Sequence, residues 1–227
     1  MKDSLLVLAA HPDDEVLGCG GSIAKLVERG MSAHIAFLSD GVGSRQDNGV
    51  IDSGVLRTRR DAASKAAEIL GAQSIQFDDL PDNQLDTVPM LEITKRVEKL
   101  ISEHQPKLVF THHAGDLNVD HQRIHQAVMT ACRPQAGSSV HSILCFEVPS
   151  STEWSTPLSD HVFSPNWFID ISNTLQKKLM ALDAYREEMR DWPHPRSKEG
   201  ITYLARWRGA TIGRDASEAF LLARHIG

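Results

Sequence analysis

Short apolar runs alternate with stretches of helical pattern along this chain, and that alternation most limits the folds open to it. The expected strands cover residues 4–10, 31–38, 74–77, 141–147 and 166–171, a further strand ends at Thr111, and a last element covers 217–224. The expected helices continue to about Arg29 and then cover 56–70, 88–103, 121–132 and 173–189. Strands that alternate with helices predict an α/β fold, with a Rossmann-like, mostly parallel sheet and helices on both faces.

Three glycines, Gly18, Gly20 and Gly21, follow the first expected strand and predict a turn there. Glycines in this place are typical of dinucleotide-binding folds, where they let a pyrophosphate approach the start of a helix. The G-x-G-x-x-G spacing is absent, however, and polar residues from His11 to Glu15 occupy the loop. We therefore expect these glycines to allow close packing beneath a site formed by that loop.

The first apolar run ends in a polar cluster made of His11, Pro12, Asp13, Asp14 and Glu15. One interpretation is a turn that opens a helix, since proline and acidic residues are both favoured in a first helical turn. The other is a metal site, because an imidazole and a carboxylate three positions apart can bind one cation. The histidine before the proline favours the metal site, with Asp13 left to take a proton.

A second apolar run ends in His112 and His113, and a polar stretch with Asn118, Asp120 and His121 follows. In open α/β sheets, ligands bind beyond the carboxyl ends of the strands. Polar clusters at two such ends can therefore converge although they are far apart in the sequence. The two clusters together predict a site with three protein ligands and an open position.

The segments Ala10–Glu15 and Asn118–His121 resemble the PIG-L/LmbE-like family of zinc-dependent N-acetylglucosaminyl deacetylases. Further matches are Ser39–Gly41, Arg59, Ile69–Gly71, Gly209-Ala210 and Ser217–Phe220. The resemblance covers nearly all 227 residues, so we expect one domain over 1–227. It implies a hydrolase that removes the N-acetyl group from an N-acetylglucosamine-type sugar or glycoconjugate.

The resemblance implies that His11, Asp14 and His121 bind Zn²⁺, although another divalent first-row metal also suits imidazole and carboxylate ligands. Asp13 is then the general base toward a metal-activated water and can return its proton to the leaving amine.

Many family members carry a histidine where this chain has Asn118. Asparagine cannot shuttle protons, but it can donate a hydrogen bond to an oxyanion. Asp120 is either an acceptor that orients a histidine or a cap of the following helix.

Three residues are candidates for substrate binding: Arg59, Asp82 and His112. The resemblance implies that Arg59 contacts a sugar hydroxyl or phosphate, and the alternative is that it lies on a solvated helix surface. The resemblance implies that Asp82 accepts hydrogen bonds from sugar hydroxyls, and the alternative is a simple Pro-Asp-Asn turn. Either His112 or His113 is expected to line the pocket.

Loops over 41–54 and 149–160 are further candidates for substrate contact, with Trp154 offering a ring face and Glu147 a carboxylate. His125 is expected to be structural, and Glu218 to be the buried partner of an arginine.

Two other functions stay open at this stage. The same metal site can act on another amide or as a hydratase of unsaturated acids. The alternative from a different class is a non-catalytic Rossmann module that binds a sugar or nucleotide without metal. The intact segment from His11 to Glu15 argues against that alternative.

The composition and the charge limit which partners and which cellular compartment we expect for this protein. The formal net charge of −6 argues against nucleic acid, and no run approaches the ~18 apolar residues of a membrane span, so we expect no stable membrane insertion. Cys19, Cys132 and Cys145 share no CxxC spacing, and the amino terminus lacks a signal peptide's pattern, which favours the cytoplasm. The expected partner is a small N-acetylated sugar or glycoconjugate, and the resemblance adds a homo-oligomer as an expectation.

Overall fold

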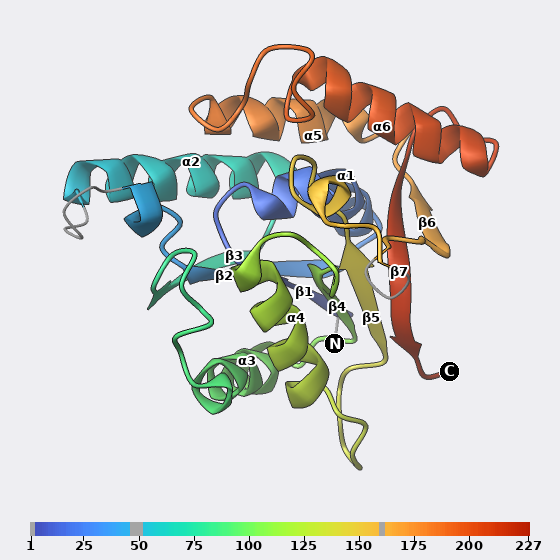
Figure 1. Ribbon diagram of the computed structural model, residues 1–227. Helices are drawn as coiled ribbons and strands as arrows, with labels where there is room; N and C mark the ends of the chain where they lie inside the picture. The colour runs from blue at the N-terminus through green and yellow to red at the C-terminus, as the bar shows by residue number, and fades with distance from the viewer. Residues whose placement is uncertain (1–2, 46–51, 159–161) are drawn as a thin grey trace.

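Seven strands form one sheet at the centre of the computed structural model, which describes residues 3–45, 52–158 and 162–227 (Figure 1). The strands are β1 (Ser4–Ala9), β2 (Ser32–Ser39), β3 (Ser74–Leu80), β4 (Leu108–His112), β5 (Ser142–Phe146), β6 (Trp167–Asp170) and β7 (Ser217–His225). Their order across the sheet is β3-β2-β1-β4-β5-β7-β6. The five strands from β3 to β5 are parallel, and β7 runs antiparallel to both of its neighbours. The predicted mostly parallel sheet is confirmed.

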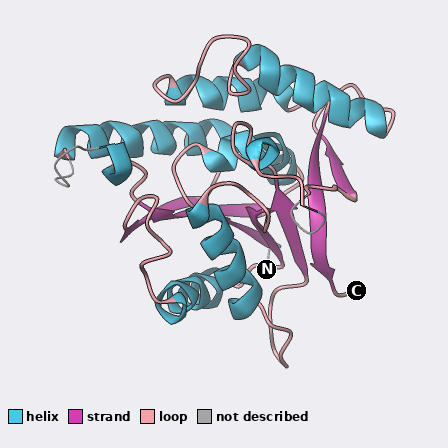
Figure 2. Ribbon diagram, viewed as in Figure 1, coloured by secondary structure: helices cyan, strands magenta, loops and turns pink. Residues whose placement is uncertain are grey.

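Helices cover both faces of this sheet, as predicted (Figure 2). They are α1 (Asp14–Glu28), α2 (Ser53–Leu70), α3 (Met90–His104), α4 (Val119–Ala131), α5 (Leu175–Leu182) and α6 (Lys198–Thr211), with short 3₁₀ turns η1 (Gly43–Arg45), η2 (Thr152–Trp154) and η3 (Asp183–Tyr185). Helices α3 and α4 lie on one face, and α1 and α2 lie on the other beneath α5 and α6. In the described part of the chain, no helix combines the length and the apolar character needed to cross a membrane.

Strand β1 shows why the sequence folds as a covered sheet. Its alternate residues Leu5, Val7 and Ala9 join the core beneath α1 and α2. The residues between them, Leu6 and Leu8, join the core beneath α3 and α4. A strand that is buried on both faces needs a continuous apolar run, and the first apolar run of the sequence supplies it.

The glycines Gly18, Gly20 and Gly21 lie inside α1 and not in the predicted turn. The helix breaks at Cys19, whose φ of −145° and ψ of 18° are non-helical. A Cβ built on Gly18 would lie 2.3 Å from the ring of Phe146, so this position tolerates no side chain. The expectation of close packing is therefore correct, although the local conformation is helical.

The break in α1 is closed by a buried ion pair between Lys178 and Glu218, 2.6 Å apart. Glu218 accepts hydrogen bonds from the backbone N–H groups of Gly21 (3.0 Å) and Ser22 (2.7 Å). Lys178 donates to the carbonyl oxygen of Leu17 at 2.8 Å. The prediction that Glu218 pairs with an arginine is wrong: its charged partner is a lysine, and the pair satisfies backbone groups that the break exposes.

Two differences concern the last third of the chain. The helix predicted over 173–189 ends at Leu182, where η3 follows, and α6 was not predicted. The buried face of α6 is a narrow line of Ile201, Ala205 and Gly209. Its exposed face carries Tyr203 and Trp207, which obscure the helical periodicity of the apolar residues.

Candidate metal centre and its cavity

The turn between β1 and α1 places His11, Asp13 and Asp14 at the carboxyl end of β1. His11 donates its backbone N–H to Asp14 Oδ2 at 2.9 Å, which fixes the start of α1. Asp13 adopts a φ of 123°, a backbone conformation that is rare outside glycine. Its N–H is held by Glu15 Oε2 at 3.0 Å, and Tyr185 donates its hydroxyl to Glu15 Oε1 at 2.7 Å. Buried contacts thus hold this turn in an unusual shape.

The second cluster enters through the start of α4, next to the carboxyl end of β4. Asn118 is the N-cap of this helix, and its Oδ1 accepts the N–H of Asp120 at 2.8 Å. The cap fixes the first turn of α4, from which His121 points toward Asp14 at the start of α1, and His121 is buried there. The convergence of the two clusters, predicted from their positions at strand ends, is observed.

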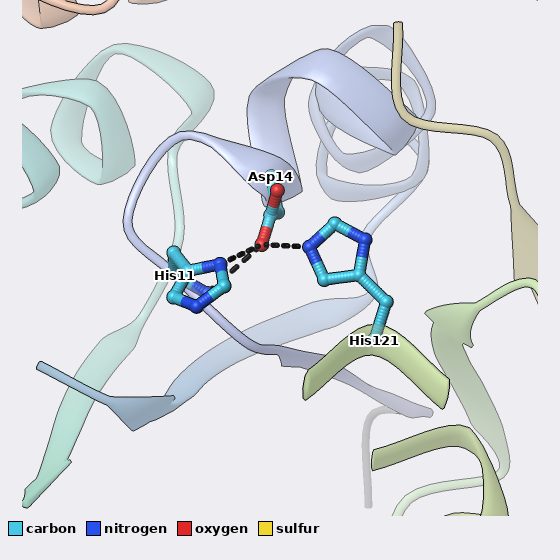
Figure 3. A group of neighbouring side chains, drawn as sticks. All are labelled: His11, Asp14 and His121. Carbon is cyan, nitrogen blue, oxygen red and sulfur yellow. Dashed lines mark hydrogen bonds and ion pairs between the residues drawn. The ribbon is translucent and has the colours of Figure 1, made fainter. Parts of the chain in front are cut away.

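His11, Asp14 and His121 lie together at this point (Figure 3). Asp14 Oδ2 lies 3.4 Å from His11 Nδ1 and 3.3 Å from His121 Nε2. One ligand atom from each of the three residues lies within 4.8 Å of the others, which is a spacing that can hold a metal ion. The predicted ligand set is therefore brought together by the fold.

A carboxylate lies behind each of the two histidines. His11 Nε2 lies 2.9 Å from Asp120 Oδ2, and His121 Nδ1 lies 3.0 Å from Asp116 Oδ1. Carboxylates in this position orient a metal-ligating imidazole and fix which nitrogen faces the ion. For Asp120, the geometry favours the acceptor over the helix cap, since the cap is Asn118.

Asp116 was not among the predicted site residues. It is buried, and it accepts hydrogen bonds from the hydroxyl groups of Ser151 and Thr152, the latter at 2.5 Å. Its position, five residues before His121 in the polar stretch after β4, was the available sequence signal. Nothing in the sequence indicated that the loop after β5 would supply the two hydroxyl groups.

The charges of this cluster support a bound cation. Burial alone would lower the pKa of His121, but Asp14 and Asp116 raise it to about 9. Burial also opposes the protonation of His11, whose pKa is nevertheless raised by Asp120, Asp14 and Asp82. Within the described residues, four carboxylates surround two imidazoles. Such an excess of buried negative charge is typical of a site that compensates it with a metal ion.

The donor atoms also fit a metal. Both ring nitrogens of His121 are buried and lack a hydrogen-bond partner of good geometry among the described residues, although each faces a carboxylate oxygen. A second group, His11 with Asp82 and Asp120, has similar spacing. In that group, Asp120 already accepts the N–H groups of Asn83 (2.7 Å) and Leu85 (2.9 Å). We therefore favour His11, Asp14 and His121 as the metal ligands.

A cavity of about 490 Å³ opens beside this cluster. The predicted residues that line it are His11, Asp13, Arg59, Asp82, Asn118 and His121. Its wall also includes Ser44, Asn83, Ser150 and Arg196, and the exposed side chains of Leu117 and Trp154 lie at its rim. The volume is in the range of small-molecule sites, roughly 300–1,000 Å³.

His112 does not take the predicted place in the cavity wall. Its side chain is fully buried, its Nε2 accepts the N–H of Ala10 at 2.8 Å, and its ring stacks on His121 with centroids 3.8 Å apart. His112 does not line the cavity, so the expected substrate contact is corrected to a buried packing contact against His121. His125 donates its Nδ1–H to the carbonyl oxygen of His112 at 2.9 Å, which agrees with its predicted structural role.

Arg59 and Asp82 reach the cavity but already have protein partners. Arg59 Nη1 lies 2.5 Å from Glu188 Oε1. Asp82 Oδ2 accepts from the Ser44 hydroxyl at 2.6 Å, and its Oδ1 lies 3.0 Å from His11 Nε2. Burial opposes ionisation of Asp82, yet His11 and Ser44 lower its pKa to about 2. Asp82 is thus an anionic acceptor in the wall of the cavity.

The two candidate loops differ in what they contribute. In the loop over 41–54, residues 46–51 lie outside the described part of the chain, and Ser44 contacts Asp82. In the loop after β5, Trp154 lies at the rim with its ring edge-on to His194. Glu147 forms a bidentate ion pair with Arg208, whose Nε and Nη2 donate to Oε1 at 2.8 Å and Oε2 at 2.7 Å, and Glu147 does not line the cavity.

Comparison with known proteins agrees with this arrangement. The family model of PIG-L, described as GlcNAc-PI de-N-acetylase, matches residues 6–132, which include both polar clusters. The chain belongs to the PIG-L family.

Two relatives of this PIG-L chain differ in their named activities. The uncharacterized deacetylase YaiS of Escherichia coli (strain K12) is 32% identical over 159 residues, which are 66% of this chain and 76% of YaiS. The 4-oxalmesaconate hydratase of Pseudomonas putida KT2440 is 30% identical and spans 94% of this chain and 83% of the hydratase.

The PIG-L fold is also seen in a solved structure. N,N'-diacetylchitobiose deacetylase from Pyrococcus horikoshii superposes with a TM-score of 0.78 at 22% sequence identity. The superposition covers 98% of this chain and 84% of that chain, so the likeness extends beyond the residues that the family model matches. At this identity, the likeness concerns the fold.

Proposed function

We propose that this PIG-L chain is a metal-dependent hydrolase that removes the N-acetyl group from an N-acetylglucosamine-type sugar or glycoconjugate. The observation that carries the proposal is the convergence of His11, Asp14 and His121, with Asp13 in the wall of the same cavity. The description of the matching family, GlcNAc-PI de-N-acetylase, supports the acetylated amino sugar as the substrate class.

The proposed metal ligands are His11, Asp14 and His121, and we propose Zn²⁺ as the ion. When bound, such an ion supplies Lewis acidity, which lowers the pKa of water and polarises a carbonyl oxygen. Asp116 and Asp120 hold the two imidazoles with one nitrogen toward Asp14. Other divalent first-row metals accept the same ligands, so the ion itself is part of the proposal.

Asp13 is the proposed general base. It lines the cavity next to the proposed metal ligands, and its backbone N–H donates a hydrogen bond to Glu15 Oε2, which fixes the turn. Burial raises the pKa of Asp13, although Arg196 and Arg59 act in the opposite direction. The raised pKa favours acceptance of a proton. In amide hydrolysis, Asp13 would take a proton from the attacking water and deliver it to the nitrogen of the leaving amine.

Asn118 is proposed to contribute a neutral hydrogen bond. Its Nδ2 donates to Asn83 Oδ1 at 2.8 Å, while its Oδ1 caps α4. The amide group carries two hydrogens, so the contact with Asn83 uses one and fixes the direction of the other. Asn118 also lines the cavity, where that hydrogen can stabilise negative charge on the acetyl oxygen.

The rim suits a sugar ring. Trp154 and Leu117 are each about half exposed there, and an indole face can cover the apolar face of a pyranose. Asp82 and Arg59, deeper in the wall, offer an acceptor and a donor for hydroxyl groups. The proposed partner is therefore a small N-acetylated sugar or glycoconjugate. The free, buried state of all three cysteines supports the cytoplasm as the proposed compartment.

A hydratase is the second candidate, and one specific observation favours it. The 4-oxalmesaconate hydratase is 30% identical over nearly the whole chain. A hydratase also needs an activated water and a nearby proton carrier, which the same residues can supply. The two candidates differ in what is released, because only hydrolysis of the amide frees an amine and acetate.

The decisive experiment measures release of free amine and acetate from a panel of N-acetylglucosamine compounds, using metal-stripped protein with and without Zn²⁺. Wild type should release both in equal amounts only with metal. Asp13→Ala should bind the metal with wild-type stoichiometry and lose roughly 10²–10⁴ in kcat, the usual contribution of a general base.

Two outcomes would contradict the proposal. Near-normal activity of Asp13→Ala would overturn its role as the base. Absence of amine release from the whole panel, together with turnover of unsaturated acids, would replace the deacetylase with a hydratase.

A further inference from the structure

Arg196 reaches the proposed general base from a distant part of the chain. Its Nη1 donates to Asp13 Oδ2 at 2.8 Å, across 183 positions of sequence. Both side chains line the cavity, and both are largely buried. Nothing in the sequence singled out Arg196, which follows Trp192, Pro193 and Pro195 in an irregular segment.

The guanidinium group is held by contacts besides the one to Asp13. Its Nε donates to Ser150 Oγ at 2.7 Å and to the carbonyl oxygen of Pro149 at 3.3 Å. The backbone N–H of Arg196 donates to His194 Nδ1 at 3.0 Å. The following residue, Ser197, is buried and caps α6. These contacts fix the direction of a planar donor group before it meets Asp13.

Asp13 is therefore held at two places. Glu15 accepts its backbone N–H, which stabilises the rare φ of 123°, and Arg196 holds one carboxylate oxygen. The contact with Arg196 sets the rotation of the Asp13 carboxylate, with Oδ2 toward the arginine.

A second carboxylate links Arg196 to Arg59. Glu188 is buried, with Oε1 2.5 Å from Arg59 Nη1 and Oε2 4.0 Å from Arg196 Nη1. The four groups form a chain of alternating charge from Arg59 through Glu188 and Arg196 to Asp13. Among the described residues, removal of Arg196 would leave the carboxylates of Asp13 and Glu188 with Arg59 as the nearby arginine, and Asp13 would lose a donor that aligns it.

We infer that Arg196 is a positioning residue for Asp13, an inference that rests on the proposed function. By holding Oδ2, Arg196 leaves Oδ1 as the oxygen that accepts the proton from water. An arginine stays protonated, so it acts through the orientation of Asp13 and does not itself transfer the proton. A change in the orientation of a reacting group changes kcat more than it changes KM.

The test compares steady-state kinetics of Arg196→Gln, Arg196→Ala and Arg196→Lys with wild type on a substrate that wild type hydrolyses. Arg196→Gln should lower kcat about 10–100-fold, change KM less than about 3-fold and keep the metal content. Arg196→Lys should recover part of kcat, and millimolar guanidinium should partly restore Arg196→Ala. Arg190→Gln is the matched control, because Arg190 is exposed and donates to backbone carbonyl groups away from the cavity.

A double-mutant comparison separates positioning from a general structural effect. In the Asp13→Ala background, Arg196→Gln should no longer lower the residual rate, since the group that it positions is gone. If Arg196→Gln does not fold, as judged by circular dichroism, Arg196→Lys and the guanidinium rescue of Arg196→Ala decide the question.

Three results would overturn the inference. They are a kcat of Arg196→Gln within about 3-fold of wild type, an increase in KM with kcat unchanged, and an equal loss of rate in the Asp13→Ala background. Each of these leaves the proposed function intact. A wild type without deacetylase activity overturns the proposed function and this role with it, so the two failures are distinguishable.

Discussion

The two walls of the cavity are built in different ways. The metal wall, made of His11 and His121 with Asp14 between them, comes from the turn between β1 and α1 and from the start of α4. These segments follow the neighbouring parallel strands β1 and β4. The arginine wall, made of Arg59, Glu188 and Arg196, comes from a helix and from irregular segments between α5 and α6. Both walls are largely buried, and both carry paired charges.

The difference between the walls lies in what fixes each of them. In the metal wall, the sheet and the start of each following helix set the positions of the proposed ligands, since β1 pairs directly with β4 and Asn118 caps α4. In the arginine wall, side-chain contacts over long sequence distances set the positions. We therefore expect substitutions in the metal wall to remove function and substitutions around the arginine wall or the rim to reduce it.

The largest effect is expected at His121. His121→Ala should lower the metal content to less than about a tenth of wild type and abolish measurable hydrolysis, because one of three protein ligands is lost. Metal analysis after gel filtration and the amine-release assay measure the two effects. His125→Ala is the matched control, one turn further along α4, and should keep the metal. Equal metal loss in both variants would show that the helix, rather than the ligand, had been damaged.

A smaller effect is expected at Asp116, behind the metal wall. Asp116→Asn should weaken metal affinity about 10–100-fold, the usual result when the carboxylate behind a metal-ligating histidine is removed. Competition with a chromophoric chelator measures this affinity. Asp86→Asn, at an exposed position, is the control. An unchanged affinity for Asp116→Asn would mean that the first turn of α4 orients His121 without help from Asp116.

The smallest effect is expected at the rim. Trp154→Ala should raise KM roughly 3–10-fold and leave kcat and metal content nearly unchanged, because the ring is about half exposed and contacts no reacting atom. Trp207→Ala removes an even more exposed tryptophan on α6, away from the cavity, and should leave KM unchanged. A fall in kcat with Trp154→Ala would instead place this side chain among the groups that align the acetyl group.

The sequence predicted most of the metal wall because that wall depends on local order. The first apolar run ends in a cluster that contains two of the proposed ligands, His11 and Asp14, and the polar stretch after Thr111 ends in the third, His121. The side of β4 on which His112 points was not readable, since one residue of shift in a strand turns a side chain to the other face. His112 was therefore assigned to the cavity although it packs in the core.

By itself, the sequence determined the α/β class, the mostly parallel sheet and the convergence of two polar clusters beyond the strand ends. These follow from apolar periodicity and from the rule that parallel strands end at the same edge. Only the tertiary structure decided that Asp116 supports His121, that Glu218 pairs with Lys178, and that Arg196 holds Asp13. The last two contacts join residues that are 40 and 183 positions apart, so long-range packing, rather than local conformation, brings their charged groups together.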